Sequence, residues 1–169
     1  MLVAQVRSLF NAYPTIIQPI LDSINAISTT AVTSLSNIDN TASGSIWTAS
    51  ELILRQLIDL NQSLLCSLSV SHPSIDVIVR TTRDMNSVVL PDGVVDIGHG
   101  LPSKLTGAGG GGCVITFIPS SIARNSNSSE NSNIGLEVVR VELERRLRAI
   151  SELFVCFRSS LGGIGVTWT

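Results

Sequence analysis

A run of glycines with a lysine shortly before it is the part of this sequence with the clearest chemistry. Residues 107–112 read Gly-Ala-Gly-Gly-Gly-Gly, and Lys104 is the only lysine in the 169-residue chain. Glycine tolerates positive φ and lets bare backbone approach a ligand. Successive backbone N–H groups can then curl around an anion such as a phosphate. The other interpretation is that the glycines only permit close packing of two backbone segments, and composition does not decide between the two.

The context of the run excludes several well-known phosphate loops. Its first, third and last residues fit G-x-G-x-x-G, which binds dinucleotides when a strand precedes it and a helix follows. Here residues 113–118 (CVITFI) are rich in β-branched residues and predict a strand after the glycines. A protein-kinase glycine loop needs a lysine on a later strand, and no lysine follows Lys104. A P-loop needs G-K-[ST] at the last glycine, where this chain has Cys113.

Helices must supply most of the framework around this loop, because apolar residues recur at helical spacing over much of the chain. The predicted helices are residues 2–12, residues 16–38, residues 46–68, a helix opened by His72 and Pro73, and residues 134–152. Pro19 is expected in the first turn of the second helix, where a missing N–H costs little. The third helix has leucines over much of its surface, which predicts that it is well buried.

The remaining segments predict loops and a few strands. Turn-forming residues predict a loop insertion over 85–102, and serine and asparagine predict a polar, low-complexity insertion over 120–133. Residues 153–158 and 164–168 are predicted to be two strands of a glycine-containing hairpin. The inward positions of the last predicted helix are Leu136, Val139, Leu143, Leu147 and Ile150. Helices with a few strands indicate an α+β class, and the length predicts one domain over residues 1–169.

Composition and charge narrow the function classes. Hydrophobic residues make up 44% of the chain and the net charge is −2, which is typical of a folded core and provides no field for nucleic acid or an anionic membrane. No apolar run reaches the roughly 18 residues that a membrane span needs. Cys66, Cys113 and Cys156 are far apart within apolar runs. This spacing predicts buried, reduced thiols of a cytoplasmic protein rather than a disulfide framework or a zinc site.

Several stretches resemble one enzyme family. Residues 104–113 (KLTGAGGGGC), followed by VIT, resemble the third signature motif of the mevalonate kinases of the GHMP kinase superfamily. Residues 56–62 (QLIDLNQ) and 70–76 (VSHPSID) are similar to the family's helix pair ahead of that motif. Residues 2–28 are similar to the segment after its domain crossover, and the closing GGIGVTW to its last strand. The resemblance covers nearly the whole chain.

The resemblance implies a fold and an activity. The fold would be the GHMP kinase C-terminal domain, with helices packed on a small antiparallel sheet in a ferredoxin-like arrangement. The activity would be transfer of the γ-phosphoryl group of ATP to mevalonate with Mg²⁺, in isoprenoid and sterol biosynthesis. The family's P-x-x-x-G-L-G-S-S-A motif is absent from these 169 residues. The chain therefore resembles the C-terminal portion only, and it is expected to be inactive without an N-terminal GHMP domain as partner.

The same resemblance assigns candidate site residues. The loop expected beside the phosphates and substrate consists of Thr106, Gly107, Ala108, Gly109, Gly110, Gly111 and Gly112. Lys104 is expected at the rim of the cleft or in a structural role, and His72 either near the substrate or as a capping residue. No catalytic residue or metal ligand is assigned within this chain. A homodimer is a further expectation, and no nucleic-acid or membrane partner is expected.

Two alternatives to this function stay open at the level of sequence. One is a non-catalytic GHMP-type binding or regulatory module, and the other is a GHMP kinase that acts on a different small alcohol. An upstream G-L-G-S-S-A motif would favour the enzyme over the module.

Overall fold

The computed structural model describes residues 2–36, 47–90, 93–98, 100–107, 112–124 and 134–157. In chain order, its elements are α1 (Leu2–Ala12), α2 (Pro14–Ser36), α3 (Ala49–Ser67), α4 (Pro73–Arg83), β1 (Ser87–Leu90), β2 (Gly93–Asp96), β3 (Ser103–Leu105), β4 (Val114–Thr116), α5 (Ser120–Arg124) and α6 (Ile134–Arg148). The strands form two separate antiparallel pairs, β1–β2 and β3–β4. The α+β class is confirmed in this coarse form, with mostly helices and two small sheets among the described residues.

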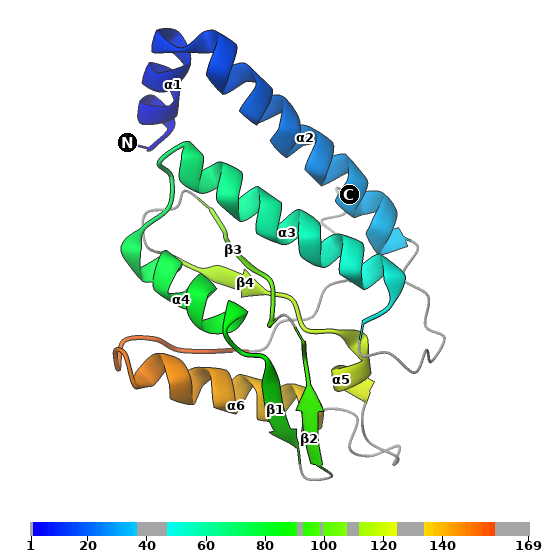
Figure 1. The fold of residues 1–169 in the computed structure, drawn as a ribbon. Coiled ribbons are helices and arrows are strands. Elements are labelled where there is room, and N and C mark those ends of the chain that lie inside the picture. The colour runs from blue at the N-terminus through cyan, green and yellow to red at the C-terminus, as the bar shows by residue number, and fades with distance from the viewer. Residues whose placement is uncertain are drawn as a thin grey trace, which may run out of the picture.

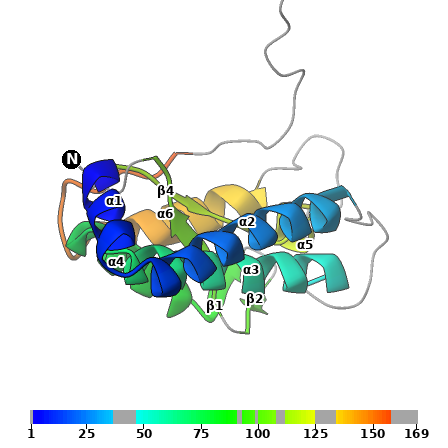
Figure 2. The same cartoon turned by 90° about the horizontal axis from the view of Figure 1, so that it is seen from above.

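The elements around the glycine loop lie in successive layers. Helix α2 packs along α3, α3 covers β3, and α4 contacts both β3 and β4 from the other side (Figure 1). Helix α6 contacts α4 and β1 at the opposite end of the molecule from α2. The view from above shows α1 at one end of α2, with which it is in contact (Figure 2). The β3–β4 hairpin is therefore held between two helices.

The boundary between α1 and α2 lies at Tyr13 and Pro14. The predicted first helix is confirmed, but α2 begins at Pro14 rather than at residue 16. Proline is favoured at a first helical position because its missing N–H has no intrahelical partner there. Pro19 consequently lies inside α2, and its predicted place in the first turn is wrong. Pro19 is on the exposed side of the helix, where water can bond the carbonyl that it leaves without a donor.

Helix α3 begins with a reciprocal cap. The Thr48 hydroxyl accepts from the Glu51 N–H at 3.2 Å, and the Glu51 carboxylate accepts from the Thr48 N–H at 2.8 Å. Such a capping box satisfies two of the free donors at a helix start. The prediction that this helix is well buried is wrong, since Leu52 and Leu60 are 42% and 51% exposed. Among the described residues, α3 packs mainly against α2 and β3, and the side that carries Leu52, Ile53 and Leu60 is exposed.

Strands β1 and β2 form a hairpin inside the segment predicted to be a loop, so that prediction is wrong for these residues. Their register pairs Ser87 with Asp96 and Val88 with Val95. Val88 is 2% exposed and Val89 is 71% exposed, an alternation typical of a half-buried strand. Turn-forming residues separate short strands as readily as they form loops. The valines that pair between β1 and β2 were the residues that favoured strands.

The segment around α5 and α6 corrects the predicted insertion. Residues 120–124 form α5, and Ile122 is buried in the core, so the polar insertion does not begin at residue 120. Residues 125–133 lie outside the described residues. Helix α6 confirms the last predicted helix, with Val139, Leu143 and Leu147 buried and Leu136 half-buried. The helix ends at Arg148, and Ile150 is 56% exposed, so its predicted inward position is wrong.

The predicted C-terminal hairpin is not found where it can be checked. Residues 153–157 form no strand, because no described segment pairs with them in a ladder. Phe154 and Cys156 nevertheless pack against the core while Leu153 and Phe157 are exposed. The Arg140 guanidinium donates to the Cys156 carbonyl at 3.3 Å and ties this segment to α6. The second predicted strand, 164–168, lies outside the described residues.

Two buried apolar clusters organise the described part of the chain. The larger joins α5, α6, β1 and the segment after β2, and consists of Trp47, Met85, Val88, Ile97, Leu101, Ile122, Val139, Leu143 and Leu147. The smaller joins α4 to the glycine hairpin through Ile75, Val79 and Leu105. None of the helices in the described part combines the length and apolarity of a membrane span.

The cysteines differ from their prediction. Cys66 and Cys113 are exposed and Cys156 is partly buried, so the predicted burial is wrong for the first two. All three are free thiols, which agrees with the absence of a disulfide framework inferred from their spacing.

Candidate functional site

The glycine run connects β3 to β4 as a hairpin loop whose base is closed by hydrogen bonds. The Thr106 N–H donates to the Cys113 carbonyl at 2.9 Å, and the Thr106 hydroxyl donates to the same oxygen at 3.1 Å. The strand predicted after the glycines is confirmed as β4, and β3 precedes them. An antiparallel strand pair around the loop agrees with the exclusion of a dinucleotide fold, which needs a helix after its glycines.

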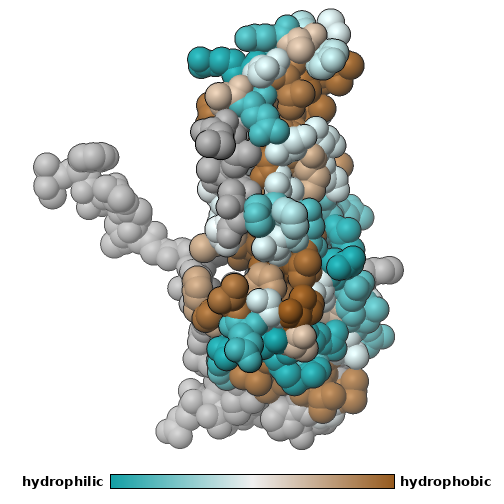
Figure 3. Space-filling model, turned by 90° about the vertical axis from the view of Figure 1, so that its left-hand side faces the viewer, coloured by the Kyte–Doolittle hydropathy of each residue, from teal (hydrophilic) through white to brown (hydrophobic). Residues whose placement is uncertain are grey.

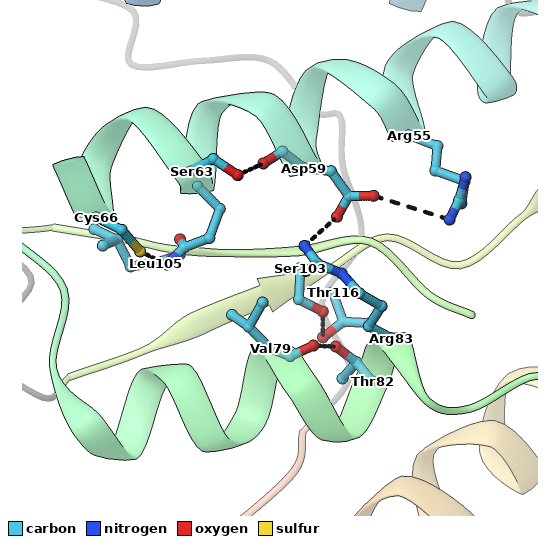
Figure 4. A network of polar contacts seen from close by, with 11 residues as sticks. Arg55, Asp59, Ser63, Cys66, Val79, Thr82, Arg83, Ser103, Leu105 and Thr116 are labelled. Carbon is cyan, nitrogen blue, oxygen red and sulfur yellow. Dashed lines mark hydrogen bonds and ion pairs between the residues drawn. The ribbon is translucent and has the colours of Figure 1, made fainter. Parts of the chain in front are cut away.

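Packing fixes the hairpin between α3 and α4. Leu105 is 3% exposed and shares the smaller core cluster with Ile75 and Val79 of α4, and Leu65 and Val114 pack against that cluster. At the far end of the hairpin, the Ser103 and Thr116 hydroxyls lie 2.8 Å apart and form a hydrogen bond (Figure 4). Leu105 and Val114, the strand residues next to the loop base, are therefore anchored by packing. Gly107 and Gly112, within the loop, are exposed.

Gly107 adopts a backbone conformation that favours glycine. Its φ is +70°, in the left-handed region, and a Cβ added there would meet nothing within 4 Å. The position therefore needs glycine for its backbone angle rather than for space. Gly112 also has room for a Cβ. Ala108, Gly109, Gly110 and Gly111 lie outside the described residues, so their assignment to a ligand stays a prediction.

Lys104 lies on β3 and is half-buried beside the loop. Its ammonium group donates to the Leu105 carbonyl at 2.9 Å. Burial lowers the pKa of the Lys104 ammonium below its ordinary value. This contact gives Lys104 a structural role at the edge of β3, which is one of the two roles expected from the sequence.

His72 is the N-cap of α4. Its Nδ1 accepts a hydrogen bond from the Ser74 N–H at 3.2 Å, and Pro73 is the first helical residue. The predicted helix start is confirmed, and the imidazole caps the helix, which is one of the two roles expected for His72 from the sequence. Its proximity to a substrate stays a prediction.

A hollow of about 390 Å³ adjoins the loop on the side of α2 and α3. Its lining is mostly apolar and consists of Ile24, Ile27, Ser28, Ala31, Leu54, Leu57, Ile58, Asn61, Leu65, Lys104, Leu105 and Gly107. Three elements thus meet at the start of the glycine loop. Apolar surface is also exposed at the α1 end of the molecule (Figure 3), where Val3 and Ile16 are 75% and 61% exposed.

Polar contacts between α3 and α4 complete the surroundings. Asp59 of α3 and Arg83 of α4 point toward each other and form an ion pair at 3.2 Å (Figure 4). This ion pair gives Asp59 a structural role between the two helices. No group of three or more His, Cys, Asp or Glu side chains that could hold a metal ion occurs among the described residues.

Gln62 is the residue near the loop that sequence reasoning missed. It is 3% exposed on α3, and its side-chain oxygen accepts from the Leu105 N–H at 2.9 Å. No signal in the sequence singled it out, because Glu51 and Asn61 are also buried polar residues of α3.

Comparison with known proteins finds mevalonate kinases of several organisms among the relatives of this chain. The chain is 35% identical to mevalonate kinase of Mus musculus over 167 residues, which are 98% of this chain and 34% of that protein. It is 34% identical to mevalonate kinase of Homo sapiens over the same shares, and 31% identical to mevalonate kinase of Arabidopsis thaliana over 90% of this chain and 31% of that protein. The chain spans about a third of the length of these curated relatives. No family model matches it.

Proposed function

We propose, from the premise that this chain is a homologue of the mevalonate kinases, that it supplies the glycine-loop part of a mevalonate kinase active site. The observation that carries this proposal is the hairpin loop whose base is closed by Thr106 and Cys113 and whose first glycine needs a left-handed backbone. In this function the chain acts as one domain over residues 1–169 with the GHMP C-terminal, ferredoxin-like architecture. Its substrate is mevalonate and its phosphoryl donor is MgATP.

The hairpin fits a neighbouring phosphate group in its chemistry. Catalysis of phosphoryl transfer depends mainly on positioning and on stabilising charge on the transferred group. An anchored β-hairpin can hold exposed backbone N–H groups of a glycine loop in place, and these groups favour anions. The described residues offer no cluster of metal ligands, so the proposal assigns Mg²⁺ binding to the complementary N-terminal GHMP domain.

Two observations support the proposal that a partner domain completes the site. The 169 residues contain no P-x-x-x-G-L-G-S-S-A motif, and they correspond to about a third of the relatives' length. Exposed apolar side chains on α2 and α3, among them Val32, Leu52, Ile53 and Leu60, are the kind of surface that a partner domain or a second copy covers. A non-catalytic GHMP-type module is the alternative that this exposed surface also supports.

The test is release of ADP from MgATP and mevalonate by this chain alone, and by this chain mixed with or fused to the N-terminal region of a mevalonate kinase. We expect activity only when both parts are present. Activity of the chain alone would contradict the partition of the site. A mixture and a fusion that are folded but silent would favour the non-catalytic module. Replacing mevalonate with other small alcohols tests for another GHMP specificity.

Substitution of Gly107 should affect this activity more than it affects stability. An L-residue in the left-handed region costs about 1–2 kcal/mol, and relaxing that strain would move the start of the loop. Gly107→Ala in the active assembly is expected to lower kcat/KM about tenfold or more, which corresponds to about 1.4 kcal/mol of transition-state stabilisation. Gly98→Ala is the matched control, because Gly98 has φ +78° and equally free space but lies outside the hairpin. Equal activity of the two variants would argue against a role for the loop start.

A further inference from the structure

The outer edge of β3 has backbone groups that β4 cannot satisfy. The Thr106 N–H donates to the Cys113 carbonyl at 2.9 Å, and the Phe117 N–H donates to the Pro102 carbonyl at 3.0 Å. In an antiparallel pair, hydrogen-bonding residues alternate with residues whose N–H and C=O point the other way. Counting back from Thr106, the next residue on β3 is Leu105, so its N–H and C=O point away from β4.

Side chains satisfy both of these Leu105 groups in place of a third strand. The Gln62 side-chain oxygen accepts from the Leu105 N–H at 2.9 Å, and the Lys104 ammonium donates to the Leu105 carbonyl at 2.9 Å. Gln62 reaches this edge from α3 across 43 positions of sequence. Leu105 directly precedes Thr106 and Gly107, so the contact anchors the backbone immediately before the loop.

The Gln62 amide is itself held in orientation. Its side-chain nitrogen lies 3.4 Å from both the Ser71 hydroxyl and the Cys66 sulfur. The Ser71 hydroxyl donates to the Asp76 carboxylate at 2.5 Å. With its nitrogen directed at these acceptors, the amide presents its oxygen to the Leu105 N–H, so the start of α4 helps to fix the orientation of the amide.

We infer that Gln62 is a positioning residue for the glycine loop, an inference that rests on the proposed function of that loop. Apolar packing of Leu105 against Ile75 and Val79 holds β3 against α4, but hydrophobic contact is non-directional. A hydrogen bond to the strand edge restricts rotation of the strand about its own axis, because it weakens steeply when misaligned. Gln62 thereby sets the direction in which the backbone enters Thr106 and Gly107.

Amide hydrogen exchange of the full chain, resolved by NMR, tests the structural part. Gln62→Met keeps the shape and helix propensity but removes the acceptor for the Leu105 N–H. We expect exchange of the Leu105 amide to rise at least tenfold in Gln62→Met relative to the β4 amides. Val139→Ala, a core change in α6, controls for general destabilisation and should raise exchange without singling out Leu105. Unchanged relative protection of Leu105 in Gln62→Met would overturn the inference.

Kinetics of the assembly of this chain with an N-terminal mevalonate kinase region test the functional part. Gln62→Met should lower kcat at least tenfold while the KM for mevalonate changes less than twofold. Val139→Ala should leave kcat per folded molecule unchanged. A loss in Gln62→Met no larger than in Val139→Ala refutes positioning. If the unsubstituted assembly is inactive, the proposed function fails, and the exchange result still decides whether Gln62 anchors β3.

Discussion

Gly100→Ala is expected to destabilise the chain by about 3 kcal/mol, from a left-handed backbone cost and a clash with α4. Gly100 has φ +73°, and a Cβ there would lie 1.9 Å from the Arg83 carbonyl oxygen and 2.5 Å from its carbon. The obstacle is helix backbone, which cannot rotate aside as a flexible side chain can. The next residue, Leu101, donates its N–H to the Thr82 carbonyl at 2.9 Å, so the substitution would push a core residue away from α4.

Gly98→Ala separates the two contributions. Gly98 has φ +78°, close to that of Gly100, but a Cβ there would meet nothing within 4 Å. Gly98→Ala is therefore expected to lower the free energy of unfolding only by the cost of the left-handed backbone, about 1–2 kcal/mol. Urea unfolding of the wild type and both variants gives the free energies of unfolding. Equal losses in the two variants would show that the segment before β3 does not press against the end of α4.

Removal of the Glu51 carboxylate is the second substitution with a large expected effect. Glu51 is 1% exposed, and its two oxygens accept from the Thr48 N–H at 2.8 Å and the Ser120 N–H at 2.7 Å. One carboxylate thus joins the start of α3 to the start of α5, which are 69 positions apart in the chain. Hydrogen bonds to a charged group contribute about 1.5–3 kcal/mol each, and Glu51→Ala is expected to cost about 3 kcal/mol or more.

Glu51→Gln is expected to rescue little of this loss. An amide has one oxygen, so its nitrogen would face one of the two N–H donors. Glu152→Gln, at an exposed position, is the control and should change the free energy of unfolding by no more than about 0.5 kcal/mol. Full stability of Glu51→Gln would mean that only one of the two N–H contacts matters.

The Glu51 carboxyl also makes stability depend on pH in a defined direction. Burial by itself raises its pKa, but the hydrogen bonds from Thr48 and Ser120 outweigh burial and lower the pKa below the ordinary value of 4.5. A lowered pKa in the folded state means that the unfolded chain binds more protons in this window. The contribution of Glu51 is therefore fully present above pH 4.5 and is lost as pH falls through the folded pKa. Urea unfolding between pH 7 and pH 3 should show a steeper loss in the wild type than in Glu51→Gln.

Local patterns in the sequence were enough to predict the elements that depend on neighbours along the chain. The cap of α4 by His72 and Pro73, the helix over 2–12 and the strand after the glycines were all predicted and are confirmed. The resemblance of residues 104–113 to the mevalonate kinases was likewise sufficient to identify the relatives that comparison finds. These features are encoded within a few residues, because helical periodicity, caps and glycine runs are short-range signals.

Tertiary structure decided which of those residues meet. The sequence indicated neither that Gln62 satisfies the edge of β3, nor that Glu51 joins two distant helix starts. It also did not indicate that the Arg83 backbone leaves no room for a Cβ at Gly100. The sequence also predicted a loop where β1 and β2 in fact pair. It predicted a well-buried α3, but one side of that helix is exposed. Each of these features depends on groups far apart in sequence that must satisfy each other's backbone donors and acceptors once packing has excluded water. The sequence alone therefore determined the glycine loop and its resemblance to the mevalonate kinases, whereas only the packed structure determined what holds the loop in place.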